Sequence, residues 1–324
     1  MENIIEVSGL RKKFPEVLAV KDIDFNVKKG ELFGFLGPNG AGKSTTIQML
    51  CTLLKPSGGK ALVNGYNTVE NPAKVRKSIG LVFQESTLDE NLTAYENLKY
   101  HANFYGVPKQ KAESRINEVL KMVQLEERKK SIVETFSGGM KRRLEIARGL
   151  LHYPKVLFLD EPTIGLDPQT RNKIWDFIQN LKKEEDITIF LTTHYMDEAE
   201  YCDRIAIIDH GEIIASDSPE KLKSDLGGDI IKAKIENKEK AKKEIENKYK
   251  VEVQEYKEYL SFEHENGEEF IPEFVNHFKE NIKSITMQKP TLDDVFLNLT
   301  GHELRDEEAS ATDKMKNKMR KRGH

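Results

Sequence analysis

The chain has 324 residues, 38% of them hydrophobic, a length and composition typical of about two globular domains. With 51 Lys+Arg against 54 Asp+Glu the net charge is −3, which argues against a strongly basic surface for nucleic acid. The two cysteines, Cys51 and Cys202, lack metal-ligand spacing and are too few for a disulfide framework, so the sequence favours a reducing cytosol.

The N-terminus lacks a basic start followed by an apolar stretch, so we expect no signal peptide. No window of the sequence approaches the roughly 18–20 consecutive apolar residues that cross a bilayer. We therefore expect a cytoplasmic chain that reaches the membrane only through a partner.

Residues 1–84 are predicted to be mainly strands. The runs 4–10 and 18–27 alternate apolar and polar residues, which is typical of antiparallel strands. The apolar run 31–36 is followed by a glycine-rich turn and then by a helical pattern over 45–54, which predicts a strand–loop–helix unit. Residues 60–84 return to strand-like runs.

From about residue 88 to residue 151 the pattern becomes helical. Thr93 is expected to cap a helix that extends through Tyr105. Nearly continuous apolar runs, 156–160 and 187–194, then flank a helix that contains Trp175, whose ring we expect in the core. Such runs separated by helices predict buried parallel strands of an α/β sheet.

Gly227–Gly228 marks a change of composition, and it divides the predicted domains. We expect a first domain over residues 1–226 and a second over 227–301, followed by a disordered polar tail over 302–324. The element order of the second domain is βαββαβ, which predicts a small ferredoxin-like fold.

Two helices of the second domain show apolar faces. Phe270, Phe274 and Phe278 are spaced four residues apart, so they should share one face of a helix. A short helix over residues 292–299 is expected to bury four apolar side chains: Leu292, Val295, Phe296 and Leu299.

The strongest motif is a complete G-x-x-x-x-G-K-[ST] match that follows a predicted strand and opens a predicted helix. Glycines let backbone N–H groups surround phosphates, and the helix N-terminus adds partial positive charge. Lys43 adds a full charge for the β/γ-phosphates, and the Ser44 hydroxyl suits Mg²⁺. The residues expected to bind ATP are Gly37, Pro38, Asn39, Gly40, Ala41, Gly42, Lys43, Ser44 and Thr45.

Two acids, Asp160 and Glu161, follow the apolar run 156–159. Carboxylates at the carboxyl end of a buried strand lie where an open α/β sheet keeps its ligand. Asp160 is expected to bind Mg²⁺ through water, because that ion keeps part of its hydration shell. Glu161 is expected to orient the attacking water rather than remove its proton early, since a carboxylate is a weak base at neutral pH.

The segment Phe136-Ser-Gly-Gly-Met-Lys141, which precedes the two acids, resembles the signature loop of ABC ATPases. The resemblance spans about residues 3–220 with the motifs in the family's order. It implies a RecA-like core, an antiparallel β subdomain and a helical subdomain at about 85–150. Phe136 and Met140 replace the family's usual Leu and Gln, but the serine and glycines that contact phosphate remain.

The same resemblance assigns roles to further residues. It implies that His194 contacts the γ-phosphate, that Gln84 contacts Mg²⁺ and water, and that Phe14 stacks on adenine. It also places Asp167 in the D-loop beside the nucleotide. The signature residues Ser137, Gly138 and Gly139 would bind ATP held by the opposite subunit, so we expect a head-to-tail dimer, preferably of identical chains.

Residues 290–301, with the second domain and the signature region, look like the daunorubicin-resistance and lipid or polysaccharide export ATPases. Such subunits work with a separately encoded, multi-span permease. The alternative is an ABC ATPase that acts on ribosomes or DNA, but those proteins usually carry two cassettes or a long coiled-coil insertion, and the 43–137 interval is short. A regulator without turnover is expected to lack Lys43 or Glu161, and both are present.

Overall fold

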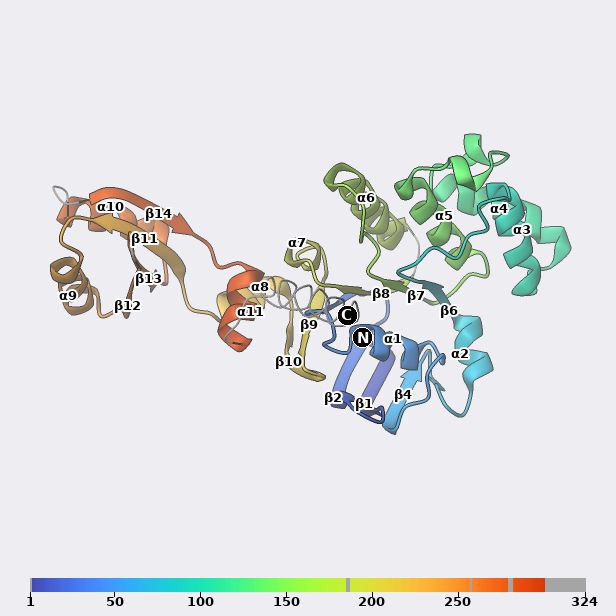
Figure 1. The fold of residues 1–324 in the computed structure, drawn as a ribbon, viewed down its shortest axis with the longest axis horizontal. Coiled ribbons are helices and arrows are strands. Elements are labelled where there is room, and N and C mark those ends of the chain that lie inside the picture. The colour runs from blue at the N-terminus through green and yellow to red at the C-terminus, as the bar shows by residue number, and fades with distance from the viewer. Residues whose placement is uncertain (1, 185–186, 257, 279–281, 301–324) are drawn as a thin grey trace, which may run out of the picture. The chain divides into compact units, whose positions relative to one another are not determined.

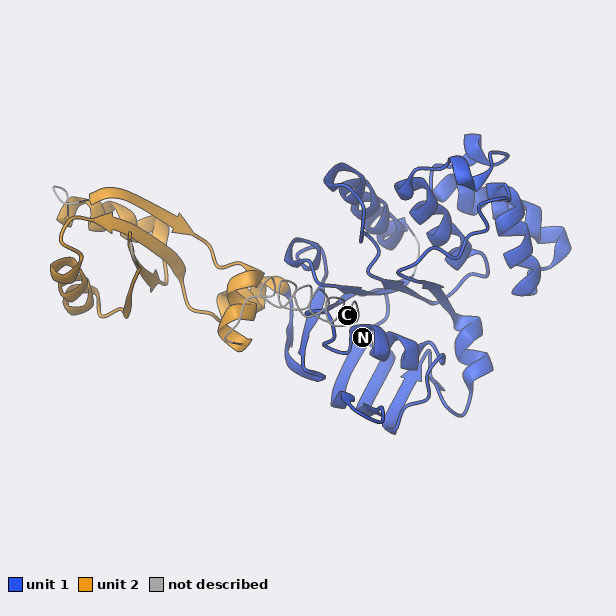
Figure 2. Cartoon of the chain, viewed as in Figure 1, with its two compact units in different colours: residues 1–218, 304–324 blue, residues 219–303 orange. Residues whose placement is uncertain are grey.

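A computed structural model describes residues 2–184, 187–256, 258–278 and 282–300. The chain forms two compact units, one that comprises Met1–Ser218 and one that begins at Pro219 (Figure 2). The polar tail expected from residue 302 lies outside the described residues. Among the helices that are described, none combines the length and the apolar character needed to span a bilayer.

The first sheet of the N-terminal unit is antiparallel, with the strand order β2-β1-β4-β5. Glu6 lies opposite Asn26, and Val7 pairs with both Phe25 and Ala61, which confirms the two antiparallel strands predicted at the N-terminus. Its strands are β1 (Asn3–Lys13), β2 (Leu18–Lys28), β4 (Gly58–Val63) and β5 (Tyr66–Asn67).

The second sheet has the order β10-β9-β3-β8-β7-β6 and is parallel except at β10 (Figure 1). Every residue of β7 and β8 is buried, which confirms the predicted central parallel strands. Its strands are β3 (Leu32–Leu36), β6 (Ile79–Val82), β7 (Val156–Asp160), β8 (Thr188–Thr193), β9 (Arg204–Asp209) and β10 (Glu212–Asp217). Because parallel strands end at one edge, the loops after β3, β7 and β8 emerge together.

Aromatic rings fill the core where the two sheets pack. The ring centroid of Phe25, on β2, lies 5.5 Å from that of Phe35 and 6.1 Å from that of Phe190. The helix α1 (Lys43–Leu50) adds Ile47 and Met49 to the same cluster. The start of α1 is therefore anchored to both sheets, which fixes the loop before it.

Of the remaining helices of this unit, α5 packs against β6 and α7 against β3 and β8, while α3, α4 and α5 pack together to one side of the second sheet (Figure 1). Thr93 caps α3 as predicted, and its side chain and that of Glu96 form a reciprocal capping box. The helices are α3 (Ala94–Phe104), α4 (Lys109–Met122), α5 (Gly138–Leu150), α6 (Pro168–Glu184) and α7 (Met196–Ala199), with 3₁₀ turns at Glu126–Arg128 and Val133–Thr135. Trp175 on α6 is buried, as expected.

The strand-like runs predicted within residues 60–84 correspond to β4 and β6, and α2 (Pro72–Ser78), a helix that was not predicted from the sequence, lies between β5 and β6. Pro72 occupies the first turn, where a missing N–H costs nothing, and Arg76 and Lys77 lie in the last turn, where they complement the helix dipole. These end signals identify the helix better than its apolar pattern, since Val75 is its one fully buried large apolar residue.

The C-terminal unit contains an antiparallel sheet of order β12-β13-β11-β14, which is the split-βαβ arrangement that the element order predicted. Phe270, Phe274 and Phe278 are buried in its core, as expected. Its elements are α8 (Pro219–Ser224), β11 (Asp229–Ile235), α9 (Lys238–Tyr249), β12 (Val253–Glu255), β13 (Leu260–His264), α10 (Gly267–His277), β14 (Ile282–Gln288) and α11 (Leu292–Thr300).

The helix α11 packs against α8, so this compact unit starts before Gly227. The boundary between the two domains that the sequence placed at Gly227–Gly228 therefore stays a prediction. Leu292, Val295 and Phe296 are buried as expected, but the prediction for Leu299 was wrong, because that side chain is 43% exposed. Leu299 lies in the last turn of α11.

Candidate active site

The loop between β3 and α1 requires glycine at two positions. A Cβ on Gly37 would lie 2.1 Å from the carbonyl oxygen of Ile208, and one on Gly42 would lie 2.6 Å from that of Ala19. Gly42 also adopts a φ of 109°, which L side chains rarely reach. The loop is thus wedged between β9 and β2, and its backbone N–H groups and the start of α1 form a cradle suited to an anion.

Lys43 is the first residue of α1, and its side chain is buried. Its Nζ donates to the carbonyl oxygens of Gly37 at 2.8 Å and Pro38 at 3.0 Å, and it lies 3.4 Å from Oε1 of Glu161. The ammonium therefore lies across the loop, close to two backbone carbonyl oxygens and a carboxylate oxygen. Phosphate oxygens entering the cradle would compete for the same ammonium protons.

Ser44 and Asp160 supply oxygens beside this lysine. The Ser44 hydroxyl donates to Oδ1 of Asp160 at 3.3 Å, and the Thr192 hydroxyl donates to the same oxygen at 2.6 Å. Hydroxyl and carboxylate oxygens are the hard ligands that Mg²⁺ prefers, so the donor set fits that ion. Thr192 was not among the predicted site residues, and it became apparent only through the parallel pairing of β7 with β8.

Glu161 follows β7 in a left-handed conformation with a φ of 45°, which is uncommon outside glycine. Its N–H donates to the Thr192 hydroxyl at 3.1 Å, and Nδ1 of His194 lies 3.4 Å from its Oε1. Burial alone would raise the pKa of Glu161, but the hydrogen bond from His194 and the charge of Lys43 outweigh it, so the pKa lies below its ordinary value. The side chain is thus a carboxylate at neutral pH.

The segment that carries His194 is fixed by a buried acid, Glu198. Oε2 of Glu198 accepts from the Thr193 hydroxyl at 2.6 Å, and Oε1 accepts from the hydroxyl of Thr163. Arg171 lies 3.8 Å from the same carboxylate, and its guanidinium covers the ring of Tyr195. These contacts join the segments after β7 and β8, which orients Glu161 and His194 toward each other.

Arg142 lies on α5, the helix that begins with the signature glycines, and connects it to the segments at the ends of β6 and β7. This residue was not predicted from the sequence. Its guanidinium donates to the carbonyl oxygens of Pro162 at 2.6 Å, Phe83 at 2.5 Å and Asp160 at 3.0 Å. Burial lowers the pKa of Arg142 to about 10, which leaves it charged at neutral pH. Its three partners lie 18 to 59 residues away from it in the sequence, so only a residue pattern across the family would have identified it.

Glu145, one turn further along α5, contacts the segment after Gln84. Its Oε1 accepts from the backbone N–H of Thr87 at 2.6 Å and from the hydroxyl of Ser86 at 3.1 Å. Gln84 itself is exposed, and its side chain makes no hydrogen bond with any described residue. Since β6 lies beside β7, Gln84 leaves the sheet at the edge where Asp160 lies.

The signature residues lie at the start of α5, where Ser137 accepts from the N–H of Met140 at 3.3 Å. A Cβ on Gly139 would lie 2.4 Å from a methyl carbon of Thr170, and one on Gly138 would lie 3.1 Å from Leu166. The glycines thus allow α5 to approach the N-terminal end of α6 closely. Asp167 immediately precedes α6, and its carboxylate accepts from the N–H of Thr170 at 3.0 Å.

The structure thus brings together five of the predicted residues: Lys43, Ser44, Asp160, Glu161 and His194. Ser137, Gly138, Gly139 and Asp167 form a separate group at the α5–α6 junction. Phe14 lies in the turn between β1 and β2, where its ring is 36% exposed and Nζ of Lys12 lies 5.1 Å from the ring centroid.

Residues 20–164 match the protein family described as ABC transporter. The chain is 41% identical over 314 residues to the linearmycin resistance ATP-binding protein LnrL of Bacillus subtilis, covering 94% of this chain and 100% of that protein. It is 38% identical over 323 residues to the daunorubicin/doxorubicin resistance ATP-binding protein DrrA of Streptomyces peucetius, covering 96% of this chain and 97% of that protein.

Solved structures show the same fold. The structure of cbiO1 from Clostridium perfringens, part of the ABC transporter complex cbiONQ, covers 76% of this chain and 96% of its own, with a TM-score of 0.65 and 30% identity. The dimeric post-hydrolysis structure of the ATP-binding cassette MJ0796, bound to ADP and Pi, covers 66% of this chain and 98% of its own, with a TM-score of 0.60 and 30% identity.

Replacing Arg142 with methionine leaves two buried carbonyl oxygens and one partly buried one without their donor, so we expect Arg142→Met to lower the free energy of unfolding by about 3 kcal/mol. Lys141→Met is the matched control, since Lys141 makes a largely exposed ion pair with Glu90 and should lose under about 1 kcal/mol. Denaturant titration followed by the fluorescence of Trp175, the chain's one tryptophan, measures both. Equal losses in the two variants would contradict the role assigned to Arg142.

Proposed function

Because the chain belongs to the family of ABC transporter ATP-binding subunits, we propose that it hydrolyses ATP at the Lys43–Glu161 site and so powers export through a separate membrane permease. The observation that carries this proposal is the convergence of the loops after β3, β7 and β8. They place a lysine, two carboxylates, a hydroxyl and a histidine at one sheet edge. That set serves phosphoryl transfer, in which the protein mainly positions groups and stabilises charge.

Phosphate binding falls to the P-loop, Gly37–Thr45. The N–H groups of the loop and the start of α1 bind the phosphates, while Lys43 exchanges its carbonyl partners for β- and γ-phosphate oxygens. Phe14, exposed in the β1–β2 turn, would stack on adenine. The strand that follows this turn borders the loop at Gly42, which puts the turn on the same side of the unit.

A magnesium ion fits the oxygens of Ser44 and Asp160, with Gln84 as a further ligand from the neighbouring strand end. When bound, the ion would neutralise part of the phosphate charge. Thr192 fixes the Asp160 carboxylate at 2.6 Å and thereby prepares the site. Asp167, which lies with the signature residues at the α5–α6 junction, would contribute to nucleotide binding from the D-loop.

Hydrolysis requires a water placed in line with the γ-phosphate. Glu161 is ionised and directed by Lys43 and His194, so it can accept a hydrogen bond from such a water and orient it. His194 would donate to the γ-phosphate. The low pKa of Glu161 makes it a poor early proton acceptor, which favours orientation and charge stabilisation as its role.

The signature loop supports a head-to-tail dimer. Ser137 and Gly138 are exposed at the N-terminus of α5, a geometry suited to phosphate, and the neighbouring Gly139 approaches Thr170 of α6 rather than the Lys43 cradle of its own chain. A second chain would therefore present them to the bound ATP. The dimeric form of the similar cassette MJ0796 agrees with this arrangement.

Export of a drug-like molecule is supported by the two relatives named for linearmycin and daunorubicin resistance. The permease would contact the helical group at about residues 85–150, where Tyr100, Phe104 and Ile132 are exposed. Such contact would hold the chain at the cytoplasmic face of the membrane. Arg142 and Glu145 would connect this surface to the strand ends that bind ATP.

Glu161→Gln should preserve ATP binding but reduce turnover at least ~100-fold, because the amide cannot provide the charge that orients the water. The closed dimer then accumulates, and size-exclusion chromatography with Mg-ATP measures it. Lys43→Ala, the control that removes the phosphate contact, should bind ATP weakly and remain a monomer. A Glu161→Gln variant that stays monomeric at saturating ATP would count against ATP-driven dimerisation.

Mixing two inactive variants tests whether Ser137 acts on the partner's ATP. Ser137→Arg blocks the signature of one chain and Lys43→Ala blocks the P-loop of the other, so a mixed dimer retains one intact site. Only the mixed dimer has an intact site, so equal amounts should restore activity up to about a quarter of the wild-type sites, the value for random pairing. An ATPase rate no higher than that of the separate variants would show that the serine acts within its own chain.

A further inference from the structure

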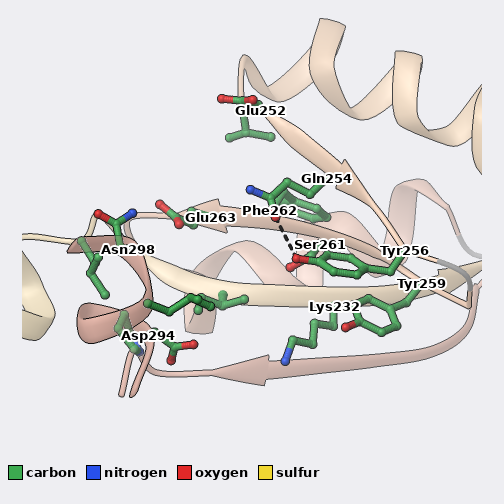
Figure 3. Close-up of a pocket in the computed structure, with 16 residues that line it drawn as sticks. Lys232, Glu252, Gln254, Tyr256, Tyr259, Ser261, Phe262, Glu263, Asp294 and Asn298 are labelled. Atoms are coloured by element: carbon green, nitrogen blue, oxygen red, sulfur yellow. Dashed lines mark hydrogen bonds between the residues drawn. The ribbon is translucent and has the colours of Figure 1, made fainter. Parts of the chain in front are cut away.

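The C-terminal unit contains an open pocket of about 490 Å³ on the face of its sheet that turns away from the core (Figure 3). Ile231 and Ala233 of β11 are buried in the core, whereas the alternating residues Ile230 and Lys232 line the pocket. Its volume lies within the range of about 300–1,000 Å³ typical of small-molecule sites. None of its lining residues belongs to the ATP site.

One end of the pocket is acidic. Glu252, Glu263 and Asp294 line it, and within the described part of the unit none of these carboxylates forms an ion pair. One oxygen of Asp294 accepts from Thr291, which leaves the charge without a cationic partner. Partial burial, together with Asp294 and Glu252, raises the pKa of Glu263, as expected where negative charges lie close together.

The other end is aromatic. The rings of Tyr256 and Tyr259 stack with centroids 4.8 Å apart, and the Tyr256 hydroxyl donates to Gln254 at 2.9 Å, which fixes that ring (Figure 3). Lys232 also lies at this end: its Nζ donates to Gln288 at 2.6 Å and lies 5.9 Å from the centroid of the Tyr259 ring, so a bound ring would take the place of this ammonium. The face of a tyrosine attracts planar rings and cations alike.

Ser261 lies on β13 between Tyr259 and Glu263, and its side chain is only 9% exposed. It lines the pocket, yet its hydroxyl makes no hydrogen bond with any residue that the structure describes. Because the residue is otherwise enclosed and its hydroxyl is open to the pocket, water or a ligand in the pocket can supply the partner. The serine therefore adds a polar contact between the acidic and aromatic ends.

We propose that this pocket binds an amphipathic organic cation, with its ammonium group against Glu263 and Asp294 and its ring against Tyr259. The Ser261 hydroxyl would bond to a polar atom of the ligand. Three carboxylates repel an anion, and an uncharged apolar ligand would desolvate them without compensation. Only a cation with an apolar body satisfies both ends at once. This site does not depend on the roles proposed at the ATP site.

The test is isothermal titration calorimetry of the full chain at neutral pH and physiological salt, with 1-naphthylmethylammonium as the probe. The cation should bind saturably with one molecule per chain. The anion 1-naphthoate and the neutral 1-naphthylmethanol, which share its ring, should bind at least about tenfold more weakly, a difference of about 1.4 kcal/mol.

Variants assign that binding to the pocket. Glu263→Gln and Tyr259→Leu should each raise the Kd of the cation about tenfold, and Ser261→Ala about threefold. Glu239→Gln, which neutralises an exposed carboxylate on α9 outside the pocket, should leave the Kd unchanged. Absence of saturable binding up to millimolar probe, equal binding of the anion, or an equal loss in Glu239→Gln and Glu263→Gln would each overturn the proposal.

Discussion

A buried lysine and a buried glutamate face each other at 3.4 Å where two parallel strands end, and the rest of the nucleotide site is arranged around that contact. Removing one partner of a buried pair leaves an unpaired charge, typically at a cost of about 3–5 kcal/mol. Each partner also has other contacts that lower this cost: Lys43 donates to two carbonyl oxygens of the P-loop, and Glu161 lies beside His194. The lysine can therefore leave the glutamate when a more strongly charged partner, a triphosphate, enters.

That exchange explains how ATP can change the shape of the unit. The strand ends that carry Asp160 and Glu161 are bonded to α5 through Arg142, and α5 carries the signature loop. A shift at the phosphates would, on the proposed function, be transmitted through these bonds to the surface proposed to meet a second chain. Binding energy becomes motion when ATP and ADP stabilise different states to different degrees.

Much of this fold follows from contiguous patterns in the sequence. The P-loop and the acids after β7 are local motifs with a fixed chemistry, and continuous apolar runs identified the buried strands. Thr192 and Arg142 were missed because their partners are set by strand pairing and helix packing, which no single segment encodes. The helix α2 was not predicted because it is short and weakly apolar. The predicted burial of Leu299 was wrong because burial depends on which neighbouring element covers a side chain, and the helical pattern does not give this.

The most direct measurement is a structure of the full chain with Mg²⁺ and a non-hydrolysable ATP analogue. We expect Nζ of Lys43 to leave the carbonyl oxygens of Gly37 and Pro38 and to lie within hydrogen-bond distance of the β- and γ-phosphates. Glu161 should then face the γ-phosphate without the lysine between them. A bound nucleotide beside a Lys43 that keeps its present contacts with Gly37, Pro38 and Glu161 would contradict the exchange on which the rest depends.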